Sequence, residues 1–444
     1  MSQERIGTLS ALSIGIGGMV GGGIFAVTGL AVEETRGAAP LAFVIAGVVA
    51  FLTAYSYWRL TLRFPSQGGT VEFLNRAFGA GVTTGSLCIL LCLSYVVLLS
   101  VYAYAFGSYG AKLLPPQDYV FWRHALITGA VVSLAIVNAF GAALAIRSEN
   151  FFNAVKMLLL AVFVAVGFAT PLDWSRLSTH EWVGPAELLA GAMVIFLNYE
   201  GFELIANAGP DIENPRRTLP IAYLGGVALV IVFYVAIAAV VLGHLDFGQI
   251  AQHSDYVLSA AADAFLGRTG AILIIVAALL ATSSAINATF YGSGRLTYLI
   301  AKSGELPVEL ERSIRDQPLE GMLLFAALTL LVANFLPLGA IATMGSAGFL
   351  IVFLAVNVAN VRLARETGSR RWISALAAIS CLVALVALCG HTLLNPSVRW
   401  HIWVLVAMLA MSIAIELAYR AATGRSIHLR HPRRGLESAE PPEA

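Results

Sequence analysis

Long apolar runs follow one another along the chain, separated by short stretches that are rich in charged residues, glycine or proline. A bilayer core about 30 Å thick needs roughly 20 apolar residues for each spanning helix, so runs of this length predict membrane helices. The predicted spans number twelve and lie near residues 9–31, 38–60, 82–114, 124–146, 151–170, 187–208, 219–243, 269–301, 321–336, 340–361, 372–391 and 399–420. We therefore predict an all-α integral membrane protein, with a single transmembrane domain over residues 1–427.

The composition supports lipid as the solvent of this chain. Hydrophobic residues make up 58% and charged residues 12%, whereas soluble domains contain about 25% charged residues. The net charge of +1 gives no reason to expect nucleic acid as a partner. Cysteines occur only within apolar segments, at Cys88, Cys92, Cys381 and Cys389. Neither pair has the set of flanking histidines and acids that would build a metal site, so we expect neither a metal nor a cofactor.

The distribution of lysine and arginine predicts the orientation. An even number of spans places both termini on one side, and the loops on that side carry 20 of the 27 basic residues, against 6 on the other. Because cytoplasmic loops carry the excess of basic residues, we expect cytoplasmic termini in the inner (cytoplasmic) membrane of a cell. The tail at 428–444, basic and then rich in proline and glutamate, is expected to be disordered.

The first span contains a segment that is poorly suited to a helix. Residues 15–23 read GIGGMVGGG, with six glycines in nine positions, and each glycine disfavours helix by about 1 kcal/mol. Backbone that leaves a helix at membrane depth is tolerated only where it lines a cavity or is buried in protein. We therefore predict an interrupted helix that faces a site; the alternative is close packing of two helices through small residues.

The sixth span is interrupted in a similar way. Its middle, residues 198–203, reads NYEGFE, and an acid at bilayer depth indicates function by default. Two interruptions five spans apart suggest two halves, one near 9–170 and the other near 187–361, each opened by a broken helix. Corresponding breaks of this kind are typical of a transporter binding site.

Three stretches resemble motifs of the amino acid-polyamine-organocation (APC) superfamily of amino acid permeases. They are GMVGGGIF at 18–25, YEGFE at 199–203 with DIENPRRTLP at 211–220, and GSGRL at 292–296 with AKSGELP at 301–307. They occur in the family's order, on the expected spans. The resemblance implies a LeuT-type inverted five-plus-five repeat with broken helices 1 and 6, and two peripheral helices near 372–420.

The same resemblance implies a substrate site made largely of backbone. The substrate's carboxylate would bind free N–H groups at the start of a half helix, its ammonium would face carbonyl groups of both breaks, and nearby side chains would select the cargo. The implied substrate-binding residues are Val20, Gly21, Gly22, Gly23, Ile24, Phe196, Leu197, Asn198, Tyr199, Glu200, Tyr95 and Tyr102.

Two acids of the sixth span need separate interpretation. Glu200 departs from the apolar or small residue common in the family before the glycine. It could bind a cationic substrate group, carry a proton, or serve as an acceptor for unwound backbone N–H groups. Glu203 resembles a family acid and is expected in a gating network, with packing as the alternative.

Lys156 stands inside the fifth span and matches a lysine of proton-coupled relatives. Its ammonium would bond carbonyl groups near Gly17 and Gly18 and the hydroxyls of Thr282 or Ser283, where burial would help it to exchange a proton. The alternatives are that Lys156 extends to the cytoplasmic surface and that the two hydroxyls bond only their own helix.

These observations predict a secondary active transporter of amino acids or related amines that works by alternating access, as a proton-coupled symporter. An exchanger and a sodium-coupled symporter are the alternatives, and a channel is a remote one. No nucleophile, base or metal cluster that would suggest an enzyme is found in the sequence. The expected partners are the small-molecule substrate, protons and the lipid bilayer.

Overall fold

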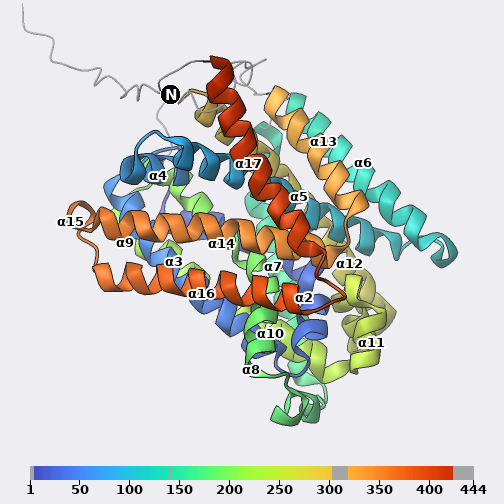
Figure 1. Cartoon of the computed structure of the whole chain (residues 1–444). Helices are drawn as coiled ribbons and strands as arrows, with labels where there is room; N and C mark the ends of the chain where they lie inside the picture. The colour runs from blue at the N-terminus through green and yellow to red at the C-terminus, as the bar shows by residue number, and fades with distance from the viewer. Residues whose placement is uncertain (1–4, 141–142, 303–318, 424–444) are drawn as a thin grey trace, which may run out of the picture.

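The computed structural model describes residues 5–140, 143–302 and 319–423, and within them the chain is helical apart from short connections and two isolated β-bridges (Figure 1). The first half contains α1 Thr8–Met19, α2 Gly23–Thr35, α3 Ala39–Arg63, α4 Thr70–Phe78, α5 Val82–Ala111, η1 Pro116–Asp118, α6 Tyr119–Phe140, α7 Ala143–Ala169, η2 Trp174–Leu177 and η3 Thr179–Glu181. The second contains α8 Pro185–Val194, η4 Phe196–Tyr199, η5 Phe202–Asp211, α9 Pro215–Pro220, η6 Ile221–Gly225, α10 Gly226–His244, α11 Phe247–Gln252, η7 Ser254–Tyr256 and α12 Val257–Lys302. The chain continues through α13 Leu319–Phe335, α14 Leu338–Arg362, α15 Ala364–Thr367, α16 Arg371–Leu394 and α17 His401–Thr423.

Within the described residues, eight continuous helices are long and apolar enough to span a membrane, and two bent pairs raise the number to ten. The bent pairs are α1 with α2, at 48°, and α8 with η4 and η5, at 49°. Two shorter apolar segments, Asn153–Ala169 and Glu320–Phe335, coincide with the fifth and ninth predicted spans. The protein is therefore a multi-pass helical membrane protein with two interrupted spans.

Two helical segments are additional to the predicted spans. The part of α12 from Val257 precedes a break at Gly267, where φ is 67°, and the rest of α12 starts close to the beginning of the eighth predicted span, near 269. The helix α4 was not predicted, because a search for long apolar runs passes over nine residues that carry Glu72 and Arg76. Its apolar side chains Val71, Phe73 and Leu74 are buried, so α4 lies against the bundle as a short amphipathic helix.

The helices differ in how much of their surface the protein covers. The protein buries 89% of the most apolar 18-residue stretch of α5 and 78% of that of α14, the largest shares among the spanning helices. These two helices pack against each other in the interior. The corresponding value is 28% for α16 and α17 and 22% for α6, so these three present most of their apolar surface to lipid. Figure 1 shows α16 alongside α14, which it contacts extensively.

The two interrupted spans touch at their breaks. A Cβ atom built on Gly18 would lie 2.8 Å from the Cα of Gly201, and one built on Gly201 would overlap the Gly18 backbone. Gly201 also has φ at 121°, which side chains disfavour. From α10, the Tyr234 hydroxyl lies 2.6 Å from the Met19 carbonyl oxygen and 3.2 Å from that of Asn198, and it can donate to either. One tyrosine thus links both breaks.

Substituting Gly201→Ala is expected to lower the thermal unfolding midpoint of the protein. The positive φ alone costs about 1–3 kcal/mol for a residue with a side chain, and the new methyl group would also push the broken spans apart. Gly129→Ala in α6 is the matched control, because a Cβ there meets nothing within 4 Å. Equal midpoints for the two variants would show that the close contact is not required.

Candidate functional site

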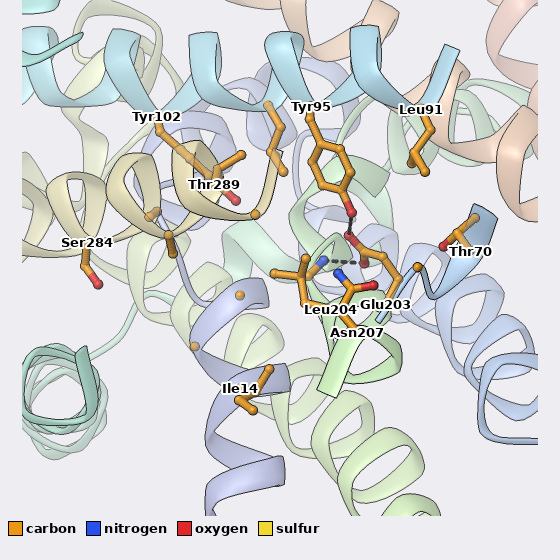
Figure 2. A pocket seen from close by; sticks show the side chains of 18 residues that line it. Ile14, Thr70, Leu91, Tyr95, Tyr102, Glu203, Leu204, Asn207, Ser284 and Thr289 are labelled. Carbon is orange, nitrogen blue, oxygen red and sulfur yellow. Dashed lines mark hydrogen bonds between the residues drawn. The ribbon is translucent and has the colours of Figure 1, made fainter. Parts of the chain in front are cut away.

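A cavity lies between the first broken span, α5, the second broken span and α12 (Figure 2). Its lining is largely apolar, with glycine backbone, two tyrosines, a carboxylate and several hydroxyls. The lining residues are Ile14, Gly17, Gly18, Gly68, Thr70, Leu91, Tyr95, Leu98, Tyr102, Gly201, Glu203, Leu204, Asn207, Ser284, Ala285, Ala288, Thr289 and Gly292. A largely apolar cavity with a few convergent polar groups is the usual form of a small-molecule site.

Glu203 connects the cavity wall to the second break. One carboxylate oxygen accepts a hydrogen bond from the Tyr95 hydroxyl at 3.0 Å, and the other accepts from the Gly201 N–H at 2.7 Å, as Figure 2 shows. The side chain is buried. Glu203 therefore holds η5 against α5 and satisfies backbone that has left the helix.

The second break is braced from the opposite side as well. The Ser346 hydroxyl of α14 accepts from the Leu197 N–H and donates to the Val194 carbonyl, both at 3.0 Å. Tyr199 donates to the Phe43 carbonyl of α3 at 2.7 Å, and the ring of Phe196 packs against Phe353. These side chains anchor the broken span to its neighbours and do not line the cavity.

The first break leaves backbone donors at the start of α2. The first hydrogen bond of α2 runs from the Ala26 N–H to the Gly22 carbonyl, at 3.1 Å. Within the described residues, the N–H groups of positions 21–25 donate no backbone hydrogen bond. Unpaired N–H groups at a helix N-terminus, together with the helix dipole, make a site that favours an anion.

Tyr102 separates these donors from the cavity. A Cβ built on Gly21 would lie 3.3 Å from the Tyr102 ring and 3.2 Å from the Ala285 methyl group, and both of these residues line the cavity. Beyond Gly23 stands the buried side-chain amide of Asn198, whose oxygen and nitrogen have no hydrogen-bond partner among the described residues. The cavity and the polar groups of α2 are thus neighbours, with one tyrosine between them.

Lys156 is buried and reaches the first break. Its ammonium donates to the Gly17 carbonyl at 3.0 Å, and its side chain is 1% exposed. Thr282 donates to the carbonyl of Ala278, four residues earlier in its own helix, and Ser283 is half-buried. The lysine therefore sits inside the protein against the interrupted span, not at the membrane surface.

Glu200 lies apart from the cavity. It is 1% exposed, and its carboxylate oxygens have no hydrogen-bond partner in the described part of the chain. Both Glu203, in the cavity lining, and Cys381 of α16 are close enough to interact with it electrostatically. Glu200 itself is not among the residues that line the cavity.

The predicted site residues divide into two groups in the structure. Tyr95, Tyr102, Gly17, Gly18 and Glu203 line the cavity, whereas Val20 through Ile24 and Phe196 through Glu200 form the two breaks beside it. Sequence reasoning missed Asn207, Ser284 and Thr289. Asn207 stands one helical turn after Glu203, and the other two continue the polar face of α12, so spacing along each helix could have indicated them.

The third predicted motif is described only in part. Gly292 lines the cavity. The side chains of residues 293–302 and all of residues 303–318 lie outside the described residues.

An interrupted-helix cavity inside a multi-pass bundle defines a class, the membrane transporters with broken helices. The sequence pattern of the family described as "Amino acid permease" matches residues 6–413 of this chain. The chain therefore belongs to the amino acid permease family, within the APC superfamily.

Relatives cover the chain over nearly its full length. An uncharacterized protein of Methanocaldococcus jannaschii is 31% identical, over 96% of this chain and 98% of the relative. The inner membrane transport protein YbaT of Escherichia coli is 30% identical, over 95% and 98%. A methylthioribose transporter of Bacillus subtilis is 26% identical, over 82% and 83%.

Replacing Glu200 with glutamine is expected to leave the substrate profile unchanged, because Glu200 does not line the cavity. The ratio of uptake rates for a cationic and a neutral amino acid should shift by less than about twofold, whereas loss of a charged contact with cargo changes such a ratio by about tenfold or more. Glu203→Gln, inside the cavity wall, is the comparison and should alter uptake. A selective loss of cationic uptake in the Glu200 variant would place that carboxylate at the substrate.

Proposed function

We propose that this protein is a secondary active transporter that moves amino acids or related amines across the inner membrane by alternating access. The observation that carries the proposal is the meeting of two broken spans beside a cavity, with N–H groups at the start of α2 that donate no backbone hydrogen bond within the described residues. Such a pair of half helices suits a zwitterion, whose carboxylate and ammonium need opposite partners. The family assignment supports the same cargo class.

Recognition in this proposal is divided between backbone and side chains. The carboxylate binds the N–H groups of Gly21, Gly22 and Gly23, and the Asn198 amide supplies a further donor or acceptor. The ring of Tyr102, which covers these donors, turns aside when substrate arrives from the cavity. Tyr95 and Glu203 stand on the entry side, in the position of a gate.

The arrangement of closed and open sides supports an inward-facing state. The cavity is lined by the first half of span one, the second half of span six and the loop after α3, all on the side of the termini. Across the membrane, Arg123 donates to Asp255 at 3.1 Å and to the Tyr104 hydroxyl at 2.9 Å, joining α6, η7 and α5. Tyr109 also donates to the Phe25 carbonyl at 3.2 Å. These contacts close the outer side.

We propose a proton as the coupling ion, with Lys156 as the group that carries it. A buried ammonium against the Gly17 carbonyl occupies the place where a cation would tie span five to the first break. Loss of the proton would weaken this charge-assisted bond and loosen the first break. Sodium coupling and exchange are the alternatives.

The proposal includes the complete topology predicted from the sequence: twelve spans, with spans one to five and six to ten as inverted repeats and both termini cytoplasmic. Support comes from the near-equal bends of the two broken pairs, 48° and 49°, and from their place at the start of each half. The sparse cover of α16 and α17 fits the role of peripheral helices.

Uptake into proteoliposomes tests the proposed function. Purified protein should take up a radiolabelled amino acid from a panel with saturation and counterflow, and an inside-alkaline pH gradient should drive accumulation. The panel includes methylthioribose, since one relative is named for that cargo. Flux that does not saturate would indicate a channel. Accumulation that needs a sodium gradient and ignores pH would exclude proton coupling.

Lys156→Ala is expected to abolish accumulation driven by the pH gradient, because the ammonium at the Gly17 carbonyl is lost. The thermal unfolding midpoint and substrate-induced stabilisation establish that the variant is folded. Lys112→Ala is the matched control, since Lys112 lies over the Tyr256 ring at the outer surface. Full accumulation by the Lys156 variant would refute the assignment.

A further inference from the structure

A second hollow lies away from the cavity, where the end of α3 meets the start of α9 and the short helix α15. Its walls combine three arginines with a tryptophan, a leucine and a threonine. The lining residues are Trp58, Arg59, Leu62, Arg63, Arg216 and Thr367.

The three arginines of this hollow carry charge without an acidic partner in the described part of the protein. The ion pairs there involve Arg36, Arg76, Arg123, Arg176 and Arg420. Glu213 and Glu366 are close in sequence to Arg216 and Thr367, yet neither forms an ion pair with these arginines within the described residues. Three guanidinium groups that converge unpaired favour an anion.

Arg59 is held in a fixed orientation. One terminal nitrogen donates to the carbonyl groups of Thr367, at 2.6 Å, and of Gly368, which secures the guanidinium at the end of α15. Its Nε is buried without a hydrogen-bond partner among the described residues, as is the indole nitrogen of Trp58. The guanidinium carbon lies 5.4 Å from the Trp58 ring. Two oriented donors therefore remain available for an acceptor with several oxygens.

The position and chemistry of the hollow favour the phosphate of a lipid over other anions. Arg63 and Arg216 are exposed at the end of membrane helices, on the basic side of the chain, and Trp58 has the place of an interfacial aromatic residue. Guanidinium groups donate in pairs and match the oxygens of a phosphate. A carboxylate has fewer oxygens and would use fewer of the donors in this hollow. Basic pockets between membrane helices at this depth suit phospholipid headgroups.

We propose that the hollow formed by Trp58, Arg59, Arg63, Arg216 and Thr367 binds the phosphate group of an anionic membrane lipid. The bound phosphate links α3 and α9, which lie next to the broken spans, to α15 between α14 and α16. The lipid thus holds α3 and α9 against α15 and stabilises the cytoplasmic side in the conformation described.

The test compares thermal unfolding midpoints of the full-length protein in detergent while phosphatidylglycerol is added, with phosphatidylcholine as the neutral lipid. We expect phosphatidylglycerol to stabilise the wild type. In the double variant Arg63→Gln, Arg216→Gln, the lipid concentration for half-maximal stabilisation should rise about tenfold or more, because each arginine near a membrane surface contributes about a fivefold factor. Arg59 is left intact because it also caps α15.

Two matched controls keep the result specific. Arg217→Gln and Arg365→Gln remove equal charge from the same side outside the hollow, and they should behave as the wild type. The two control substitutions are combined in one double variant. If that variant lost as much lipid stabilisation as the Arg63→Gln, Arg216→Gln variant, the effect would come from general surface charge, and the proposed site would be overturned. Stabilisation by glycerol phosphate or inorganic phosphate, with no further gain from the lipid, would overturn the lipid as its source.

Discussion

The contact between Gly18 and Gly201 is the constraint on which the rest of the molecule depends. Backbone that leaves a helix inside a bilayer exposes polar groups that lipid cannot satisfy, so each break needs protein around it. The two breaks meet where neither has a side chain. The groups around them supply the missing hydrogen bonds: Tyr234 to both breaks, Ser346 and Glu203 to the second. Both glycines also line the cavity, so the close approach lies at its wall.

The polar groups around the breaks fall into two sets with different roles. One set is committed to the structure: Tyr199 to α3, Ser346 to the end of α8, and Glu203 to Gly201 and Tyr95. The other set remains available, namely the N–H groups that open α2 and the amide of Asn198. A transporter needs both, because a rigid frame holds the donors in place while uncommitted donors can gain and release a ligand.

The charged residues at the helix ends also fall into two sets. Arg123 pairs with Asp255 and joins α6 to η7, and Arg76 and Arg420 pair with acids of their own helices. The arginines around Trp58, by contrast, form no ion pair within the described residues. An arginine that is already paired stabilises the bundle, whereas an unpaired one can still attract an anion.

The sequence alone determined a helical membrane protein with interrupted first and sixth spans. The length of the apolar runs, the glycine content and the position of charges were enough, because spans and breaks depend on local helix propensity and on transfer to lipid. The family resemblance also pointed to Tyr95, Tyr102 and Glu203, which line the cavity. Only tertiary structure decided that Glu203 lines the cavity and bonds Tyr95 while Glu200 stays outside the lining, because side-chain direction at an unwound residue depends on backbone angles such as the positive φ of Gly201. The Tyr234 bridge and the arginine hollow likewise join residues that are distant in sequence, and no local pattern records such contacts. The packing of α4 against the bundle was also decided only by the tertiary structure.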